Sequence, residues 1–142
     1  MLMPDKTHTT NYTDTFIEIA ADSNQMKGEE PPLKEQKSVA RLQYELLANH
    51  PYQYTSDDVL FEVFAQRHHV PKSQREAARQ RFFSKGQACF RASPLPKKYG
   101  WGVHSNSQGK IALIGRDTSE YEKFLSDNGV TKVRAMRSTR KK

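Results

Sequence analysis

Residues 82–104 read FFSKGQACFRASPLPKKYGWGVH, and this stretch decides the fold that we predict. Its hydrophobic residues change from a helical spacing to a period of two after Gly86, so we expect a helix to end there and strands to begin. Residues 88–93 and 99–105 are predicted strands, joined by a rigid proline-containing connection at residues 94–98. Gly86 is predicted to close the helix in the left-handed conformation, because glycine adopts a positive φ without steric cost.

The alternation of side chains along these two predicted strands decides which residues share a face of the sheet. In the first strand Phe90 points one way, whereas Cys89 and Arg91 point the other way. In the second strand Val103 opposes His104. If Phe90 and Val103 face the core, then Cys89, Arg91 and His104 share an outer surface.

The flanking sequence predicts further elements on both sides of this stretch. β-Branched and aromatic residues predict a strand at residues 15–19, and a polar loop follows at residues 21–37. Elsewhere, apolar residues at helical spacing predict helices, and turn and cap residues predict where they end. The remaining predicted elements are helices at residues 38–49, 56–68, 72–83 and 119–127, and strands at residues 110–115 and 131–136.

Residues 57–66 are ambiguous, because the run VLFEVF within them also suits a buried strand. Thr55 and Asp58 resemble a capping box in which Asp replaces the usual Glu. Leu60 and Phe64 also lie on one helical stripe. We therefore favour a helix here, with a strand as the alternative.

Together these elements predict a single α+β domain, with a small, mainly antiparallel sheet and about four helices packed on it. The expected order is strand, three helices, three strands, helix and strand. The domain spans residues 14–136 in this prediction, between a flexible N-terminal tail at residues 1–13 and a basic C-terminal tail at residues 137–142. A chain of 142 residues can bury one core without a metal or a disulfide.

The composition favours a soluble, cytoplasmic protein. Hydrophobic residues make up 35% of the chain, a low share that fits a soluble domain with polar tails, and no apolar run approaches the length of a membrane span. The first residues lack the apolar core of a signal peptide. Cys89 is the only cysteine, so no intramolecular disulfide forms and a reducing compartment is expected. No residue spacing predicts a metal, a cofactor or a phosphate loop.

The charge of the chain is unevenly distributed. Residues 1–60 hold five Lys/Arg and ten Asp/Glu, whereas residues 61–142 hold eighteen and six, so the halves carry −5 and +12. This asymmetry favours an anionic partner, with nucleic acid as one such partner; a solvated basic surface, or packing of the acidic half against the basic half, is the alternative. The candidate binding residues are Lys85, Arg91, Lys97, Lys98, Trp101, Arg134 and Arg137.

An enzyme is the competing functional class. Cys89 could form a thiolate and imidazole pair with His104, or with His68 or His69, since a nearby imidazolium lowers the pKa of a thiol. The alternative function is therefore an enzyme with a small pocket near Cys89, Arg91 and His104. A lone cysteine in a strand is more often a small buried side chain, so we assign no catalytic residue. Residues 93–102 could also be a presented loop, which would be typical of an interaction module.

Trp101 lies between two glycines, and glycines in a strand often mark a bulge or a close approach of another group. A ligand and a packed helix are both compatible with this pattern. Packing is the favoured interpretation.

Four motifs carry a resemblance to a known family. They are SKGQACFRASPLPKKYGWGVH at residues 84–104, YTSDDVLFEV at 54–63, TFIEIA at 15–20 and KVRAMRS at 132–138. In this order they resemble a family of small bacterial proteins known only as a domain of unknown function. The resemblance spans about residues 15–138. It implies a bacterial, single-domain protein and supplies neither a substrate nor a catalytic residue.

Overall fold

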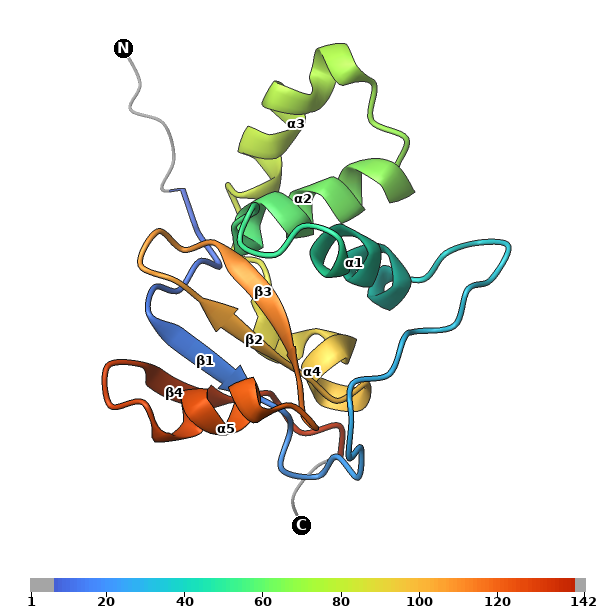
Figure 1. Cartoon of the computed structure of the whole chain (residues 1–142). Coiled ribbons are helices and arrows are strands. Elements are labelled where there is room, and N and C mark those ends of the chain that lie inside the picture. Colours follow the sequence, from blue (N-terminus) through green and yellow to red (C-terminus); the bar gives the residue numbers. More distant parts are fainter. Residues whose placement is uncertain (1–6, 140–142) are drawn as a thin grey trace.

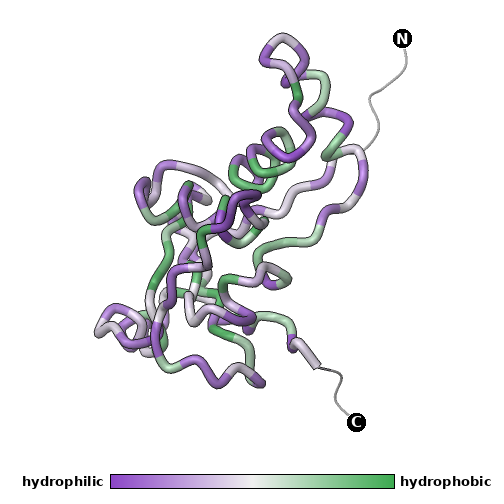
Figure 2. Tube along the Cα trace, turned by 90° about the vertical axis from the view of Figure 1, so that its right-hand side faces the viewer, coloured by the Kyte–Doolittle hydropathy of each residue, from purple (hydrophilic) through white to green (hydrophobic). Residues whose placement is uncertain are grey.

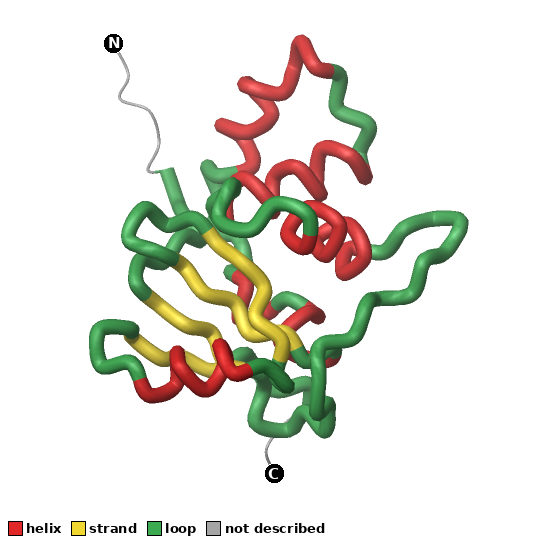
Figure 3. The backbone as a smooth tube through the Cα atoms, in the orientation of Figure 1, coloured by secondary structure: helices red, strands yellow, loops and turns green. Residues whose placement is uncertain are grey.

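One four-stranded sheet lies at the centre of the fold (Figures 1 and 3). The computed structural model describes residues 7–139 of the chain. In their order across the sheet, the strands are β3 (Ile111–Gly115), β2 (Trp101–Ser105), β1 (Thr15–Glu18) and β4 (Thr131–Arg134). Strand β2 is antiparallel to both β1 and β3, whereas β4 is parallel to β1. The prediction of a mainly antiparallel sheet is therefore confirmed.

Helices cover both faces of this sheet, and the single α+β domain is confirmed (Figure 1). One helix lies on one face, three lie towards the other face, and a further helix packs on these away from the sheet. In that order they are α5 (Ser119–Ser126), then α1 (Val39–Ala48), α2 (Ser56–Arg67) and α4 (Pro94–Lys98), and finally α3 (Arg75–Phe82). Two short 3-10 helices are η1 (Lys72–Gln74) and η2 (Phe90–Ala92).

The alternation of strand residues produces an apolar core on each face of the sheet. Ile17 and Val103 are buried on the face towards α1 and α2, where Leu47 packs in the same core. Phe16, the neighbour of Ile17, points to the opposite face and packs against Tyr121 of α5. Both faces of β1 are therefore buried.

Helix α2 settles the ambiguity at residues 57–66 in favour of a helix. The capping box predicted at its start is present. Thr55 Oγ1 accepts a hydrogen bond from Asp58 N at 3.1 Å, and Asp58 Oδ2 accepts one from Thr55 N at 3.0 Å. These two bonds satisfy backbone donors that the first turn of a helix leaves without partners.

The predicted strand at residues 88–93 is wrong. Residues 90–92 within it form the 3-10 helix η2, and α4 follows where a rigid connection was expected. Ser93 is the physical reason, because its Oγ accepts a hydrogen bond from Leu95 N at 3.1 Å and so caps α4. Pro94 then occupies the first helical position, where its fixed φ suits a helix and its missing N–H costs nothing.

The predicted left-handed cap at Gly86 is also wrong. Among the glycines of residues 7–139, positive φ angles occur at Gly100 and Gly109, each with a φ of 78°. Helix α3 ends instead with right-handed turns, in which Ser84 N donates a hydrogen bond to Arg81 O at 3.2 Å. No left-handed residue is needed for such an ending.

The start of the described chain is bound to α2. Asp57, in the first turn of that helix, accepts hydrogen bonds from Thr10 N at 2.7 Å and from Thr9 Oγ1 at 2.6 Å. The predicted tail at residues 1–13 therefore includes a segment that is bound to the domain, and residues 1–6 lie outside the described part.

The end of the described chain is bound to the turn after β1. Asp22 Oδ2 accepts hydrogen bonds from Ser138 N at 2.9 Å and Thr139 N at 3.0 Å. These bonds, led by the one from Thr139 N, lower the pKa of Asp22. The predicted basic tail at residues 137–142 begins in this segment, and residues 140–142 lie outside the described part.

Hydrophobic residues along the chain occur in short stretches separated by hydrophilic ones (Figure 2). Within residues 7–139, no helix has both the length and the apolar character needed to cross a membrane. The loop between β1 and α1 contains neither helix nor strand and runs along the side of the domain (Figure 3).

Candidate anion-binding site

The carboxyl ends of β1, β3 and β4 lie at the same end of the sheet, because these three strands run in one direction and β2 runs in the other. A small hollow of about 130 Å³ lies at this end. Its walls come from β1 and the turn after it, the turn after β3, helix α5 and β4. The lining residues are Glu18, Ile19, Ala20, Ala21, Ser23, Arg116, Tyr121 and Arg134.

Arg116 is held at the hollow by the turn that follows β3. Its backbone N donates a hydrogen bond to Gly100 O at 3.0 Å, and its guanidinium carbon lies 5.3 Å from the centre of the Tyr121 ring. A guanidinium over an aromatic face is attracted by the ring quadrupole. The turn and the ring therefore fix the position of this charge.

Tyr121 is a buried residue that lines the hollow. Its hydroxyl oxygen accepts a hydrogen bond from Ile19 N at 2.9 Å, and only 1% of the residue is exposed. Burial raises the pKa of Tyr121, so the group is a neutral phenol at neutral pH. Its hydroxyl proton is then available to a further acceptor.

Arg134 and Glu18 stand side by side on β4 and β1, where the strand register pairs them. Both point to the face covered by α5, because Ile17, next to Glu18, points into the opposite core. Among residues 7–139, Arg116, Arg134 and Glu18 form no ion pair. The hollow thus combines two guanidinium groups and one carboxylate, with a formal charge of +1.

Five of the basic residues predicted as a patch lie around this end of the sheet. Arg91 is the best-defined neighbour, since its Nε donates a hydrogen bond to Arg134 O at 2.6 Å. Helix α4 lies beside the turn after β1, because Pro96 O accepts a hydrogen bond from Ala20 N at 3.0 Å. The five residues are Arg91, then Lys97 and Lys98 of α4, Arg134 of β4, and Arg137 just after β4.

Arg91 also binds the backbone of β4 at the edge of the sheet. Strand β4 is at the edge of the sheet, and the bond from Arg91 Nε reaches a carbonyl on its free side. The carbonyl of Arg91 in turn accepts a hydrogen bond from Met136 N at 2.7 Å. These contacts cover part of an edge that would otherwise be open to pairing with another strand.

Trp101 is used in packing, which was the favoured interpretation of its neighbouring glycines. Its indole N–H donates a hydrogen bond to Glu29 O at 2.8 Å, and its ring centre lies 5.8 Å from that of Tyr44. A Cβ atom on Gly28 would lie 2.8 Å from the indole ring, so the long loop lies directly against it. The partly buried indole of Trp101 therefore takes part in packing between β2, α1 and the long loop.

Lys85 lies apart from the other predicted residues. It follows α3 and lines a separate hollow of about 540 Å³, with Phe64 of α2 and His69 among its neighbours. The structure therefore does not bring Lys85 to the end of the sheet where Arg134 lies.

Cys89 and His104 lie on opposite sides of the sheet. Cys89 Sγ is 3.4 Å from the hydroxyl of Tyr12, which packs on the core that contains Val103. His104 points away from Val103 and stacks on Phe124 of α5, with 4.0 Å between ring centres. The predicted shared surface fails because the segment containing Cys89 is not a strand. Neither Cys89 nor His104 lines the hollow at the end of the sheet, the hollow beside Lys85 or the hollow between α2 and α3.

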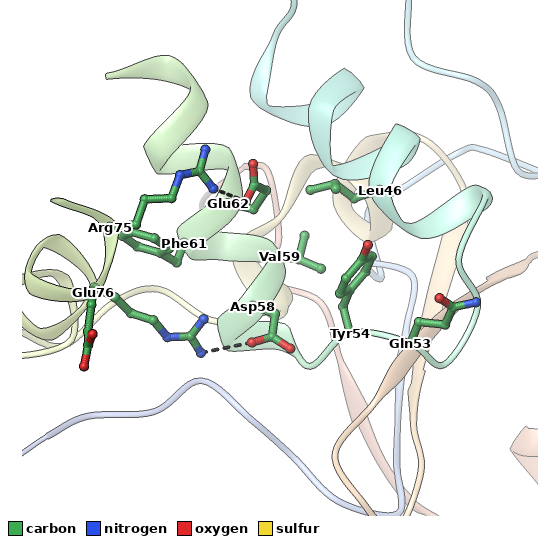
Figure 4. Close-up of a pocket in the computed structure, with 10 residues that line it drawn as sticks. Leu46, Gln53, Tyr54, Asp58, Val59, Phe61, Glu62, Arg75 and Glu76 are labelled. Atoms are coloured by element: carbon green, nitrogen blue, oxygen red, sulfur yellow. Dashed lines mark hydrogen bonds and ion pairs between the residues drawn. The ribbon is translucent and has the colours of Figure 1, made fainter. Parts of the chain in front are cut away.

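A larger hollow, about 860 Å³, lies between α2 and α3 (Figure 4). Its two arginines already have carboxylate partners. Arg75 Nη1 lies 2.6 Å from Glu62 Oε1, and Arg79 Nη2 lies 3.0 Å from Asp58 Oδ1. An anion entering here would have to displace these carboxylates, so the hollow is a poor anion site despite its size.

The comparison with protein families agrees with the resemblance seen in the sequence motifs. The profile of the family of unknown function DUF6157 matches residues 7–141. The chain belongs to this family. No curated protein and no solved structure matches it. Membership of DUF6157 confirms the predicted domain of unknown function, while the bacterial origin stays a prediction.

Proposed function

We propose that this protein binds an anionic ligand whose phosphate or carboxylate group lies between Arg116 and Arg134. The observation that carries the proposal is that both guanidinium groups line one small polar hollow and have no carboxylate partner among residues 7–139. The planar fork of arginine suits two-point binding of phosphate or carboxylate. Tyr121 and Ser23 add hydroxyl donors on the same walls.

The size of the hollow limits what enters it. A volume of about 130 Å³ is below the range of roughly 300–1,000 Å³ that is usual for whole small-molecule ligands. Only a compact charged group therefore fits, and any larger remainder of the ligand lies outside. We infer that Lys97 and Lys98 of α4, which is bonded to the turn after β1 through Pro96 O, and Arg137 just after β4 add positive charge near this end of the sheet. A nucleic acid is one ligand of this kind, because its repeated phosphates would meet both the hollow and the surrounding cations.

We further propose that this binding takes place in a bacterial cytoplasm. The single cysteine, Cys89, supports a reducing compartment, and the bacterial origin is what the resemblance of the sequence motifs implies.

The test is a binding titration with inorganic phosphate and with short single-stranded DNA and RNA. Arg116→Ala and Arg134→Ala should each lower the affinity about tenfold or more, because each removes a charged partner of the anion. Affinity for the nucleic acids should also fall as salt rises. Arg81→Ala is the matched control, since it removes the same charge from an exposed position on α3. If all three variants bind like the wild type, the hollow is not the site.

A further inference from the structure

A purely anionic ligand gives no role to Glu18, because the carboxylate of this residue would repel it. Glu18 lines the hollow, and among residues 7–139 its carboxylate forms no ion pair, while its backbone carbonyl accepts a hydrogen bond from Ala135 N at 2.9 Å. Opposite charges in register on neighbouring strands usually attract each other directly. Glu18 and Arg134 are in register and both line the hollow, yet among residues 7–139 they do not form an ion pair.

A simple anion would meet two attractive charges and one repulsive charge in this hollow. A ligand with an ammonium group next to its anionic group would instead meet an opposite charge at every contact. The carboxylate would then also select against anions that lack the ammonium group.

We propose that the ligand is a small zwitterion or carries a zwitterionic head group, with its anionic part on Arg116 and Arg134 and its ammonium on Glu18. This inference rests on the proposed anion binding at the two arginines. Ser23 and the Tyr121 hydroxyl are placed to donate to the anionic part. The volume of about 130 Å³ suits such a head group, because it equals the space of only about four water molecules.

The charged residues of the hollow come from different segments of the backbone. Glu18 ends β1, and Ser23 stands at the far end of the turn that follows, so the acid and the hydroxyl come from one short segment. The two arginines come from separate segments, after β3 and at the end of β4. The acidic and basic groups can therefore be changed independently.

The experiment compares two pairs of probes that differ by one ammonium group. Glycine is compared with acetate, and O-phosphoethanolamine with ethyl phosphate, by calorimetry or by NMR titration of the intact chain. We expect the ammonium-bearing member of at least one pair to bind about tenfold or more tightly, and Arg134→Ala to weaken that binding. Glu18→Gln should abolish the preference and should strengthen binding of the simple anion, because it removes the repulsive charge and keeps the shape.

The outcomes separate this inference from the proposed function. If acetate or ethyl phosphate binds through the arginines with no gain from the ammonium group, the zwitterion is wrong and anion binding stands. If no probe binds, or if binding ignores Arg116→Ala and Arg134→Ala, both proposals fail. If Glu18→Gln does not fold, the comparison of the probe pairs on the wild-type protein still shows whether the ammonium group strengthens binding.

Discussion

Gly102 shows how one residue sets the spacing between the sheet and α5. A Cβ atom at this position would lie 2.6 Å from Phe16 Cζ and 2.9 Å from Tyr121 Cε2. Both rings are buried, with exposures of 0% and 1%, so neither can move away without disturbing the core. We therefore expect Gly102→Ala to lower the free energy of unfolding by about 1–3 kcal/mol, as overpacked cores do. Urea unfolding measures this loss.

Gly86→Ala is the control for this substitution. A Cβ atom there would lie 3.9 Å from His8 Nδ1, which is an ordinary contact, and the backbone is not left-handed. It should leave stability unchanged or raise it by about 0.4–1 kcal/mol, because alanine restricts the unfolded chain. Equal losses in both variants would show that crowding at Gly102 is not the cause.

At the scale of the element, α2 is the helix whose start the sequence predicted from chemistry. Thr55→Ala removes the side-chain acceptor for Asp58 N and should destabilise the protein by about 1 kcal/mol. Thr55→Ser keeps the hydroxyl and should retain most of the stability. Thermal unfolding of the two variants side by side makes the comparison, and an equal shift in midpoint would contradict a role for the capping bond.

At residues 88–93, in contrast, the sequence pattern predicted the wrong element. Six residues of alternating character are too few to distinguish a strand from a tight turn, because a strand also needs a partner and the sequence does not show one. The decisive signal was Ser93 followed by Pro94, which are the residues that begin a helix. Local hydrogen bonding at one serine therefore outweighed the alternating pattern.

At the scale of the whole molecule, the fold class was predictable and the site was only partly so. Arg134 was a candidate because basic residues crowd the second half of the chain, whereas Arg116, Ser23 and Tyr121 were missed. Their proximity to Arg134 depends on the parallel pairing of β1 with β4, which joins segments more than 110 residues apart. Periodicity reports which face a residue occupies but not which strands become neighbours. The available clue was that Arg116 directly follows a predicted strand.

His104 links three parts of the molecule, and this link should make stability depend on pH. Its ring belongs to β2, stacks on Phe124 of α5, and has Nδ1 2.9 Å from the hydroxyl of Tyr52 in the loop after α1. Burial lowers the pKa of His104, although Asp14 and Asp127 act in the opposite direction. The folded protein therefore holds this imidazole neutral at pH values where the unfolded chain has already protonated it.

The sign of the effect follows from proton uptake. Above the ordinary histidine pKa of about 6.5, the ring is neutral in both the folded and the unfolded state, so His104 makes its full contribution to the free energy of unfolding. As pH falls below that value, the unfolded chain binds the extra proton first, so stability falls until the folded-state pKa is passed. His104→Gln should lose stability at pH 8 through poorer packing, but should show a smaller further loss between pH 7 and pH 5 than the wild type. Urea midpoints across this range give the two curves, and parallel curves would mean that the neutral ring of His104 does not hold α5, the sheet and the loop together.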